Sequence, residues 1–193
     1  MINILEIKNT YFSYQDGTDA LQDINLSVKQ GEFLGILGGN GSGKTTLLKI
    51  LNGLLKTTKG EVYLEENNIK SINKNMLFRK VCTCFQNPED QLFSSTVGED
   101  IAFGPINMGL PKEEVKRRIN YALEAVEMVA FADKTIHNLS FGQKKRVCLA
   151  GVLAMNPKVM LLDEPTSCLD PMGVNAIMQL LRKLNKEQGI TMI

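Results

Sequence analysis

The sequence predicts an α/β fold with a mainly parallel sheet, an antiparallel β region at the N-terminus and an inserted helical subdomain. Two apolar runs, residues 33–37 and 159–162, are typical of strands that are covered on both faces. Residues 45–54 and 140–155, next to these runs, have the apolar spacing of helices. Residues 4–28 instead alternate apolar and polar positions, which is typical of antiparallel strands.

Caps and turns set the limits of the predicted elements. Capping boxes mark two helix starts, Thr96 with Glu99 and Ser140 with Gln143, and Asp170 caps another helix. The predicted order begins with strands over 2–14, 24–28 and 33–37, a helix over 45–54 and strands over 61–64 and 81–85. Helices from 96, from 111 and over 140–155 follow, then a strand over 159–162, a helix from 170 and a strand start at 190–193. We expect one domain over residues 1–193, in which about 67–138 and the helix 140–155 form the helical subdomain.

The composition excludes several classes of protein. The 193 residues include 22 Lys and Arg against 21 Asp and Glu, so the formal net charge is +1. That balance favours neither a nucleic-acid binder nor a polybasic membrane anchor. No run reaches the roughly 18 apolar residues of a membrane span, and the N-terminus lacks the basic region and apolar core of a signal peptide. The four cysteines lie in apolar runs without CxxC spacing, so we expect buried, reduced thiols in a cytosolic protein.

The strongest motif is a glycine-rich loop over residues 38–45 that fits G-x-x-x-x-G-K-[ST]. It follows a predicted strand and precedes a helix, the setting in which backbone N–H groups and a helix N-terminus bind phosphates. A dinucleotide-binding fingerprint does not fit, because the third glycine is absent. We therefore predict a P-loop NTPase core whose nucleotide-binding residues are Gly38, Gly39, Asn40, Gly41, Ser42, Gly43, Lys44, Thr45 and Thr46.

Two carboxylates follow the buried strand 159–162. A parallel sheet brings the C-terminal ends of its strands to the edge where the phosphate loop lies. We expect Asp163 to hold Mg²⁺, directly or through water, with the Thr45 hydroxyl as a second ligand, and Glu164 to polarise an attacking water. A solvated strand cap is the alternative interpretation, and the P-loop upstream favours the catalytic one.

Residues 139–143 read Leu-Ser-Phe-Gly-Gln and begin a capped helix. Lys144, Lys145 and Arg146 follow directly, and this combination has the chemistry of a second anion site. The P-loop already serves the nucleotide of this chain, so a second phosphate-binding surface suggests a partner subunit.

Taken in order, these motifs resemble the ATP-binding cassette (ABC) ATPase family over essentially the whole chain. The set comprises Tyr14, the P-loop, Gln86 and the segments 139–143, 161–164 and 167–170. The stretches 85–93 and 97–105 further resemble the cobalt and energy-coupling-factor importer group.

The resemblance implies roles for single residues. Tyr14 is expected to stack on adenine, and Gln86 to sense Mg²⁺ and the attacking water. Ser140, Gly142 and Gln143 are expected to contact ATP bound by the opposite subunit, with Asp170 reaching across the same interface. The implied catalytic residues are Glu164, Lys44 and Gln86, and the implied Mg²⁺ ligands are Thr45, Gln86 and Asp163.

Two features depart from the family pattern. Phe141 stands where glycine is commonest, and we expect its ring to point away from the nucleotide. The switch histidine of the family follows the strand that begins at Ile190, whereas this sequence ends at Ile193, so we expect the C-terminal part to be missing. The single histidine, His137, is expected to be a solvated loop residue.

The resemblance implies a subunit that binds and hydrolyses ATP with Mg²⁺ and energises a membrane importer for a metal ion or a vitamin. Expected partners are a second ABC ATPase subunit, in a homo- or heterodimer, and integral-membrane transporter subunits, with no nucleic acid. The expected location is peripheral, at the cytoplasmic face of the cell membrane. Two alternatives stay open: a non-hydrolysing nucleotide-binding fragment, and a soluble ABC protein of translation or repair.

Overall fold

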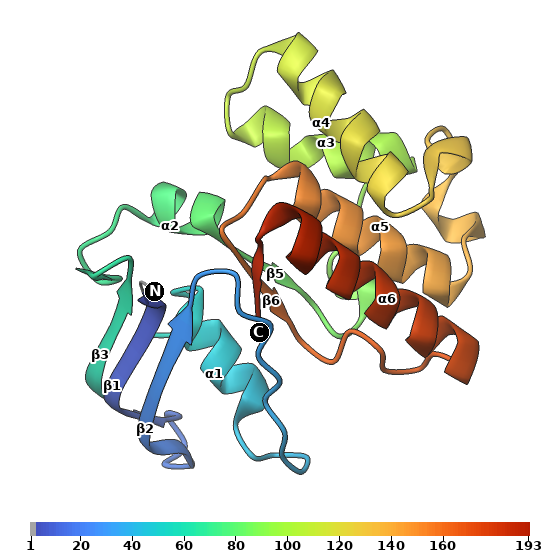
Figure 1. Cartoon of the computed structure of the whole chain (residues 1–193). Coiled ribbons are helices and arrows are strands. Elements are labelled where there is room, and N and C mark those ends of the chain that lie inside the picture. Colours follow the sequence, from blue (N-terminus) through green and yellow to red (C-terminus); the bar gives the residue numbers. More distant parts are fainter. Residues whose placement is uncertain (1–2) are drawn as a thin grey trace.

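The computed structural model describes residues 3–193 and shows an α/β molecule with two sheets (Figure 1). Four antiparallel strands form one sheet in the order β2-β1-β3-β4, and three parallel strands form the other in the order β5-β6-β7. The predicted fold class and its N-terminal antiparallel region are therefore confirmed. The first two residues of the predicted domain lie outside the described residues.

The antiparallel sheet is built around β1 (Asn3–Ser13), which pairs with both β2 (Asp19–Lys29) and β3 (Lys59–Leu64). The short strand β4 (Asn67–Asn68) pairs with β3 at the sheet edge. Apolar side chains of β1, among them Leu5 and Ile7, are buried against the helix that follows the phosphate loop. The alternation read from the sequence thus marks the buried side of this sheet.

The centre of the parallel sheet is β6 (Val159–Leu162), which pairs with β5 (Val81–Cys84) and β7 (Thr191–Met192). All four residues of β6 are buried, as predicted for a strand that is covered on both faces. The prediction of a covered strand over 33–37 is wrong, because within this run only Phe33 forms a bridge, to Met192, and Leu37 is 96% exposed. A ladder needs a neighbouring strand of matching length, and β7 offers two residues.

The helices are α1 (Lys44–Leu51), α2 (Lys74–Lys80), α3 (Val97–Asn107), α4 (Lys112–Ala125), α5 (Phe141–Ala154) and α6 (Pro171–Gln188), with 3₁₀ turns η1 (Pro88–Asp90), η2 (Val129–Phe131) and η3 (Ile136–Asn138). Both predicted capping boxes are present, at Thr96 and Ser140, and the Asp170 side chain accepts the Gly173 N–H at the start of α6. Helix α1 ends earlier than predicted, since Gly53 turns the chain at φ 76°. The sequence did not predict α2, which has seven residues and one buried side chain.

Two buried apolar clusters meet at β6. One cluster packs α3, α4, α5 and α6 together and includes Met160 and Leu162. The other packs α1 between the two sheets and includes Val159 and Leu161. Side chains of a strand alternate between faces, so β6 joins the two clusters and its end is held rigidly beside the phosphate loop.

Helices α3, α4 and α5 contact one another and lie together in the upper and right part of Figure 1. Within the predicted insertion 67–138, however, β4 pairs in the antiparallel sheet and β5 in the parallel one. The division into subdomains stays a prediction. Of the four cysteines, Cys82, Cys84 and Cys148 are buried as expected, whereas Cys168 is exposed.

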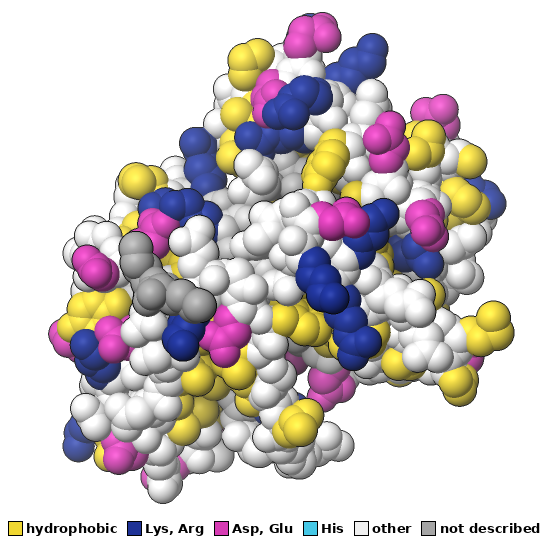
Figure 2. Space-filling model, viewed as in Figure 1, with side chains coloured by type: hydrophobic (Ala, Val, Ile, Leu, Met, Phe, Trp, Pro, Cys, Tyr) yellow, Lys and Arg dark blue, Asp and Glu magenta, His cyan; other side chains and the backbone are white. Residues whose placement is uncertain are grey.

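The face shown in Figure 2 carries Lys and Arg side chains intermixed with Asp and Glu, in keeping with the net charge of +1. Charges of both signs occur over the antiparallel sheet and over the helices alike. Among the helices of residues 3–193, none combines the length and the apolar character that a membrane span requires.

Candidate functional site

The phosphate loop, residues 38–45, leads from the bridge at Phe33 into α1. Gly43 is the N-cap of α1 at φ 88°, a backbone conformation that favours glycine. The Lys44 ammonium folds back over the loop and donates to the carbonyl oxygens of Gly38 at 3.0 Å and Gly39 at 2.9 Å. Loop amides, the start of a helix and a cation therefore gather at one place, which is the chemistry that binds phosphate.

Two predicted Mg²⁺ ligands, 118 residues apart in sequence, are in contact. The Thr45 hydroxyl donates to Asp163 Oδ1 at 3.1 Å, and Asp163 is 8% exposed at the end of β6. A hydroxyl and a carboxylate are oxygen ligands of the kind that Mg²⁺ prefers. No cluster of three or more His, Cys, Asp or Glu able to hold a metal occurs within residues 3–193. The pair fits Mg²⁺ that takes its remaining ligands from phosphates and water.

The two predicted hydrolytic side chains also meet. Gln86 follows β5 and Glu164 follows β6, and these strands are parallel neighbours whose C-terminal ends lie together. Gln86 Nε2 donates to Glu164 Oε2 at 2.7 Å. Glu164 adopts φ 44°, a left-handed conformation that is unusual for a residue with a side chain.

Tyr14 lies just beyond β1, at the entrance to the phosphate loop. Its hydroxyl shares a hydrogen bond of 2.7 Å with Thr46 Oγ1, and its ring meets the Phe12 ring edge-on at 5.0 Å between centroids. The side chain is 42% exposed, so an aromatic face is open beside the loop. The adenine-stacking role stays a prediction.

A polar cavity of about 530 Å³ brings most of these residues together. Its lining comprises Tyr14, Thr18, Asp19, Ala20, Asn40, Gly41, Ser42, Gly43, Lys44, Thr45, Thr46, Gln86 and Glu164. Gly38, Gly39 and Asp163 do not line it, but each is hydrogen-bonded to a residue that does: the two glycine carbonyls accept from Lys44, and Asp163 accepts from Thr45. Sequence reasoning missed residues 18–20, although the turn signal at residues 16–17 returns the chain beside Tyr14.

The predicted signature residues lie outside this cavity. Ser140 and Gln143 cap α5 reciprocally, with Gln143 N donating to Ser140 Oγ at 3.3 Å and Ser140 N donating to Gln143 Oε1 at 2.9 Å. A Cβ on Gly142 would lie 3.6 Å from Leu169, so this segment adjoins the one that ends in Asp170. The signature segment and Asp170 thus lie near each other, away from the nucleotide-binding loop of their own chain.

The second anion site expected at the start of α5 stays a prediction, but the three cations that follow this start point to other partners. Lys144 pairs with Glu89 and Arg146 with Glu127, both at 3.1 Å. The Lys145 side chain is 1% exposed and points inward, and burial lowers its pKa. The centre of the Phe141 ring lies 5.7 Å from Lys145 Nζ, and Phe141 does not line the cavity. His137 lies in η3 and is exposed, as expected.

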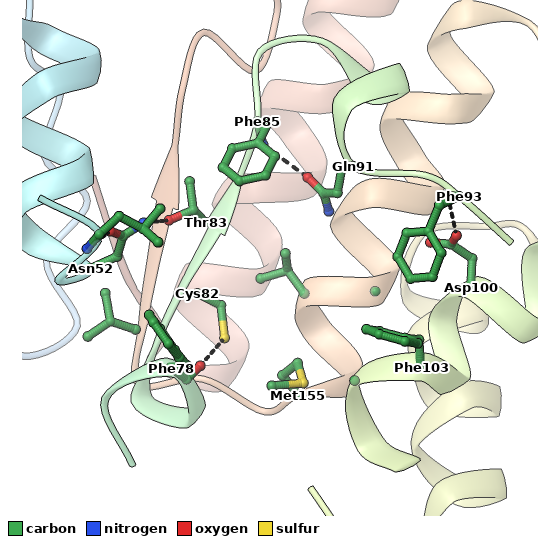
Figure 3. A pocket seen from close by; sticks show the side chains of 15 residues that line it. Asn52, Phe78, Cys82, Thr83, Phe85, Gln91, Phe93, Asp100, Phe103 and Met155 are labelled. Carbon is green, nitrogen blue, oxygen red and sulfur yellow. Dashed lines mark hydrogen bonds between the residues drawn. The ribbon is translucent and has the colours of Figure 1, made fainter. Parts of the chain in front are cut away.

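An apolar groove of about 310 Å³ is lined by residues from the end of α1 and from α2, β5, α3 and α5 (Figure 3). The Phe93 and Phe103 rings meet edge-on at 4.6 Å between centroids and are 64% and 50% exposed at its rim. Gln91 joins its walls by accepting the Phe85 N–H and donating to the Cys148 carbonyl. The loop that leaves Gln86 therefore forms one side of the groove, and one segment borders both sites.

Comparison with known proteins identifies the family to which this sequence is similar. A family description of ABC transporters matches residues 21–167. The energy-coupling factor transporter ATP-binding protein EcfA of Methanocaldococcus jannaschii is 54% identical over 98% of this chain and 68% of its own length. That of Methanosphaera stadtmanae is 53% identical over 100% of this chain and 70% of its own length.

Solved structures of ABC proteins resemble this chain as the related sequences do. The structure of cbiO1 from Clostridium perfringens, described as part of the ABC transporter complex cbiONQ, matches with a TM-score of 0.92 and 46% identity over 100% of this chain and 78% of that one. A dimeric ATP-binding cassette described as a post-hydrolysis state with ADP and Pi matches with a TM-score of 0.85 and 35% identity over 97% of this chain and 85% of that one.

The chain spans 65% of the length of a relative from Geobacter sulfurreducens and 68% of that from M. jannaschii. The matched region nevertheless includes the phosphate loop, Gln86, the signature segment and the adjacent carboxylates Asp163 and Glu164. By its sequence, its fold and the geometry of this site, the chain belongs to the ABC transporter ATP-binding domains, with EcfA and CbiO ATPases among its close homologues.

Proposed function

We propose that this chain binds and hydrolyses ATP and that hydrolysis energises a membrane importer for a metal ion or a vitamin. The observation that carries the proposal is the Gln86–Glu164 contact of 2.7 Å at the cavity that the phosphate loop lines. An amide and a carboxylate at this place suit the orientation and deprotonation of a water molecule.

Each residue has a defined task in this mechanism. The Lys44 ammonium exchanges the carbonyls of Gly38 and Gly39 for phosphate oxygens. Gln86 orients the water, and the Glu164 carboxylate accepts its proton as the oxygen attacks the γ-phosphorus, so that ADP and phosphate are released. Mg²⁺, when bound with the nucleotide, neutralises phosphate charge, and Thr45 and Asp163 are the residues that would hold it.

A second ABC subunit is the partner that the signature segment fits. Ser140, Gly142 and Gln143 lie outside the cavity of their own chain, at the start of a helix whose amides favour an anion. In a head-to-tail pair they would contact the ATP of the opposite subunit, with Asp170 at the same interface. One structural neighbour, described as a dimer with ADP and Pi bound, supports this arrangement.

The apolar groove is the proposed docking place for an integral-membrane subunit. Exposed aromatic side chains at its rim, Phe93 and Phe103, supply apolar area, and the loop after Gln86 joins the groove to the hydrolytic pair. Hydrolysis would thereby move the membrane subunit through this loop. The protein would then be peripheral, at the cytoplasmic face of the membrane, and the description of a neighbour as part of the ABC transporter complex cbiONQ supports assembly with further subunits.

Replacing Glu164 with glutamine tests the hydrolytic role. Glu164→Gln keeps a partner for Gln86 but cannot accept a proton, so we expect MgATP binding to persist while phosphate release falls by about 10²–10⁴-fold. Lys44→Ala is the matched control that loses binding. Undiminished release by Glu164→Gln would remove Glu164 from the mechanism. Wild-type protein that binds MgATP but releases no phosphate above the Glu164→Gln level would favour the non-hydrolysing alternative.

A further inference from the structure

A buried ammonium group that this mechanism does not use lies behind the Gln86–Glu164 pair. Lys145, near the start of α5, is 1% exposed. Its Nζ donates to the carbonyl oxygen of Gln86 at 2.6 Å, to that of Glu164 at 3.2 Å and to Ser167 Oγ at 3.4 Å. These three acceptors match the three N–H donors of an ammonium group.

All three acceptors are uncharged. None of the ion pairs found within residues 3–193 includes Lys145. The nearest aromatic group is the Phe141 ring, at 5.7 Å from Nζ. Burying a cation without a paired carboxylate is unfavourable, and an apolar side chain of the same length would avoid that penalty. Hydrophobic packing alone therefore gives no reason for a lysine at this position.

Two of the three contacts of Lys145 fall on the main chain of the residues whose side chains meet in the cavity, Gln86 and Glu164. Glu164 is held at φ 44°, which is unfavourable for a residue other than glycine. Its carbonyl oxygen accepts from Ser167 N at 3.1 Å, from Ser167 Oγ at 3.0 Å and from Lys145. Three donors thus converge on the oxygen of this strained turn, and the same ammonium reaches across to Gln86.

We propose that Lys145 is a positioning residue for ATP hydrolysis, whose ammonium clamps the carbonyls of Gln86 and Glu164 and so fixes the spacing of their side chains at the cavity. The inference rests on the proposed function, in which these two side chains act on the attacking water. Lys145 also belongs to the helix that begins at the Ser140 cap, so the clamp joins the signature segment to the hydrolytic pair.

The direct test removes the donors and keeps the apolar volume. Lys145→Met retains an unbranched side chain without N–H groups. We expect kcat for phosphate release to fall by about 10²-fold, as for a misplacement of about 1 Å, with KM for ATP within about twofold of the wild-type value. Lys145→Gln, which keeps N–H donors without the charge, should recover part of kcat. If Lys145→Met does not fold, Lys145→Gln decides alone, because the shorter glutamine side chain cannot reach both carbonyls as lysine does. A wild-type kcat in Lys145→Gln then overturns the proposal, and a reduced kcat supports it.

Val147→Ala is the matched control for lost packing. Val147 is 0% exposed on the same helix and has no polar side-chain atom, so its truncation lowers stability without touching either carbonyl. A fall in kcat that Val147→Ala reproduces at an equal loss of Tm overturns the proposal, as does a Lys145→Met protein with the wild-type kcat.

Hydrogen exchange distinguishes a failure of the inference from a failure of the proposed function. The Ser167 amide, which donates to the Glu164 carbonyl, should exchange faster in Lys145→Met than in Val147→Ala, whether or not ATP is hydrolysed. Equal exchange in the two variants overturns the clamp. If the wild-type protein releases no phosphate above the Glu164→Gln level, the proposed function fails, and so does the role of Lys145 in positioning residues for hydrolysis. The exchange rates still decide whether the clamp exists.

Discussion

Replacing Gly43 with alanine tests how tightly the phosphate loop is built against the antiparallel sheet. A Cβ at Gly43, where φ is +88°, would lie 2.5 Å from the Ala20 carbonyl oxygen and 2.9 Å from Leu21 Cδ2. The Ala20 oxygen belongs to β2, which is paired with β1, so it cannot yield without disturbing the sheet. A Cβ at Gly41, where φ is +77°, or at Gly39 would meet no atom within 4 Å, and Gly39 lies outside the left-handed range.

The three positions separate conformational strain from steric overlap. Alanine in the left-handed region costs about 1–2 kcal/mol, and overlap with packed atoms costs a further ~1–3 kcal/mol. Gly39→Ala should therefore change the free energy of unfolding by less than about 0.5 kcal/mol. Gly41→Ala should lower it by about 1–2 kcal/mol and Gly43→Ala by about 2–5 kcal/mol. At about 2–4 °C per kcal/mol, the Tm of Gly43→Ala falls by ~4–20 °C.

Thermal unfolding followed by circular dichroism, without nucleotide, measures the Tm of the wild-type protein and the three variants under one set of conditions. We expect the loss to increase in the order Gly39, Gly41, Gly43. If Gly43→Ala melts within about 2 °C of Gly41→Ala, the overlap with Ala20 is relieved at little cost and the reasoning about a rigid β2 is refuted. A Gly39→Ala protein that loses as much as Gly41→Ala would refute the assignment of strain to φ.

Two further predictions concern stability and partner binding. Lys158 and then Lys80 hold the pKa of Glu65 below its ordinary value of 4.5, so Glu65→Gln should lower the free energy of unfolding by about 1 kcal/mol at pH 7. Such a contribution is present above the unfolded pKa and is lost as pH falls through the folded pKa. The free energies of unfolding of the two proteins, from urea titrations, should therefore approach each other as pH falls below 4.5, and a constant difference would contradict the ion pairs. Phe93→Asp should lower the amount of membrane subunit that co-purifies with the protein, whereas the similarly exposed control Val129→Asp should not. Equal amounts with both variants would exclude the groove as the docking place.

Most residues of the candidate site could be predicted from motifs that are short and continuous in the sequence. The phosphate loop carries its residues consecutively, and Asp163 and Glu164 directly follow a buried strand. Parallel pairing of β5 and β6 then accounts for the meeting of Gln86 with Glu164. The strand expected over 33–37 failed, because pairing depends on the length of a neighbour that is remote in sequence.

The roles of the three adjacent cations at the start of α5 could not be predicted from the sequence. Successive residues of a helix point about 100° apart, so Lys144, Lys145 and Arg146 cannot face one ligand together. The outer two reach Glu89 and Glu127, whereas Lys145 points between β5 and β6. A basic run at the start of a helix is therefore weak support for an anion site unless the packing of the helix is known.

Strand alternation explains β6 and Asp163 but not Glu164, the second carboxylate after the strand. Alternate residues of β6 enter the two core clusters, and Asp163 continues this pattern by meeting Thr45 of α1. The same pattern would direct the Glu164 side chain toward α5. The left-handed turn at Glu164 breaks the alternation instead, so its carboxylate meets Gln86 at the cavity and its carbonyl faces Lys145. The strained turn after this one strand thus lets Asp163 meet Thr45 while Glu164 meets Gln86, and the donors that hold the turn include one from a helix that precedes the strand.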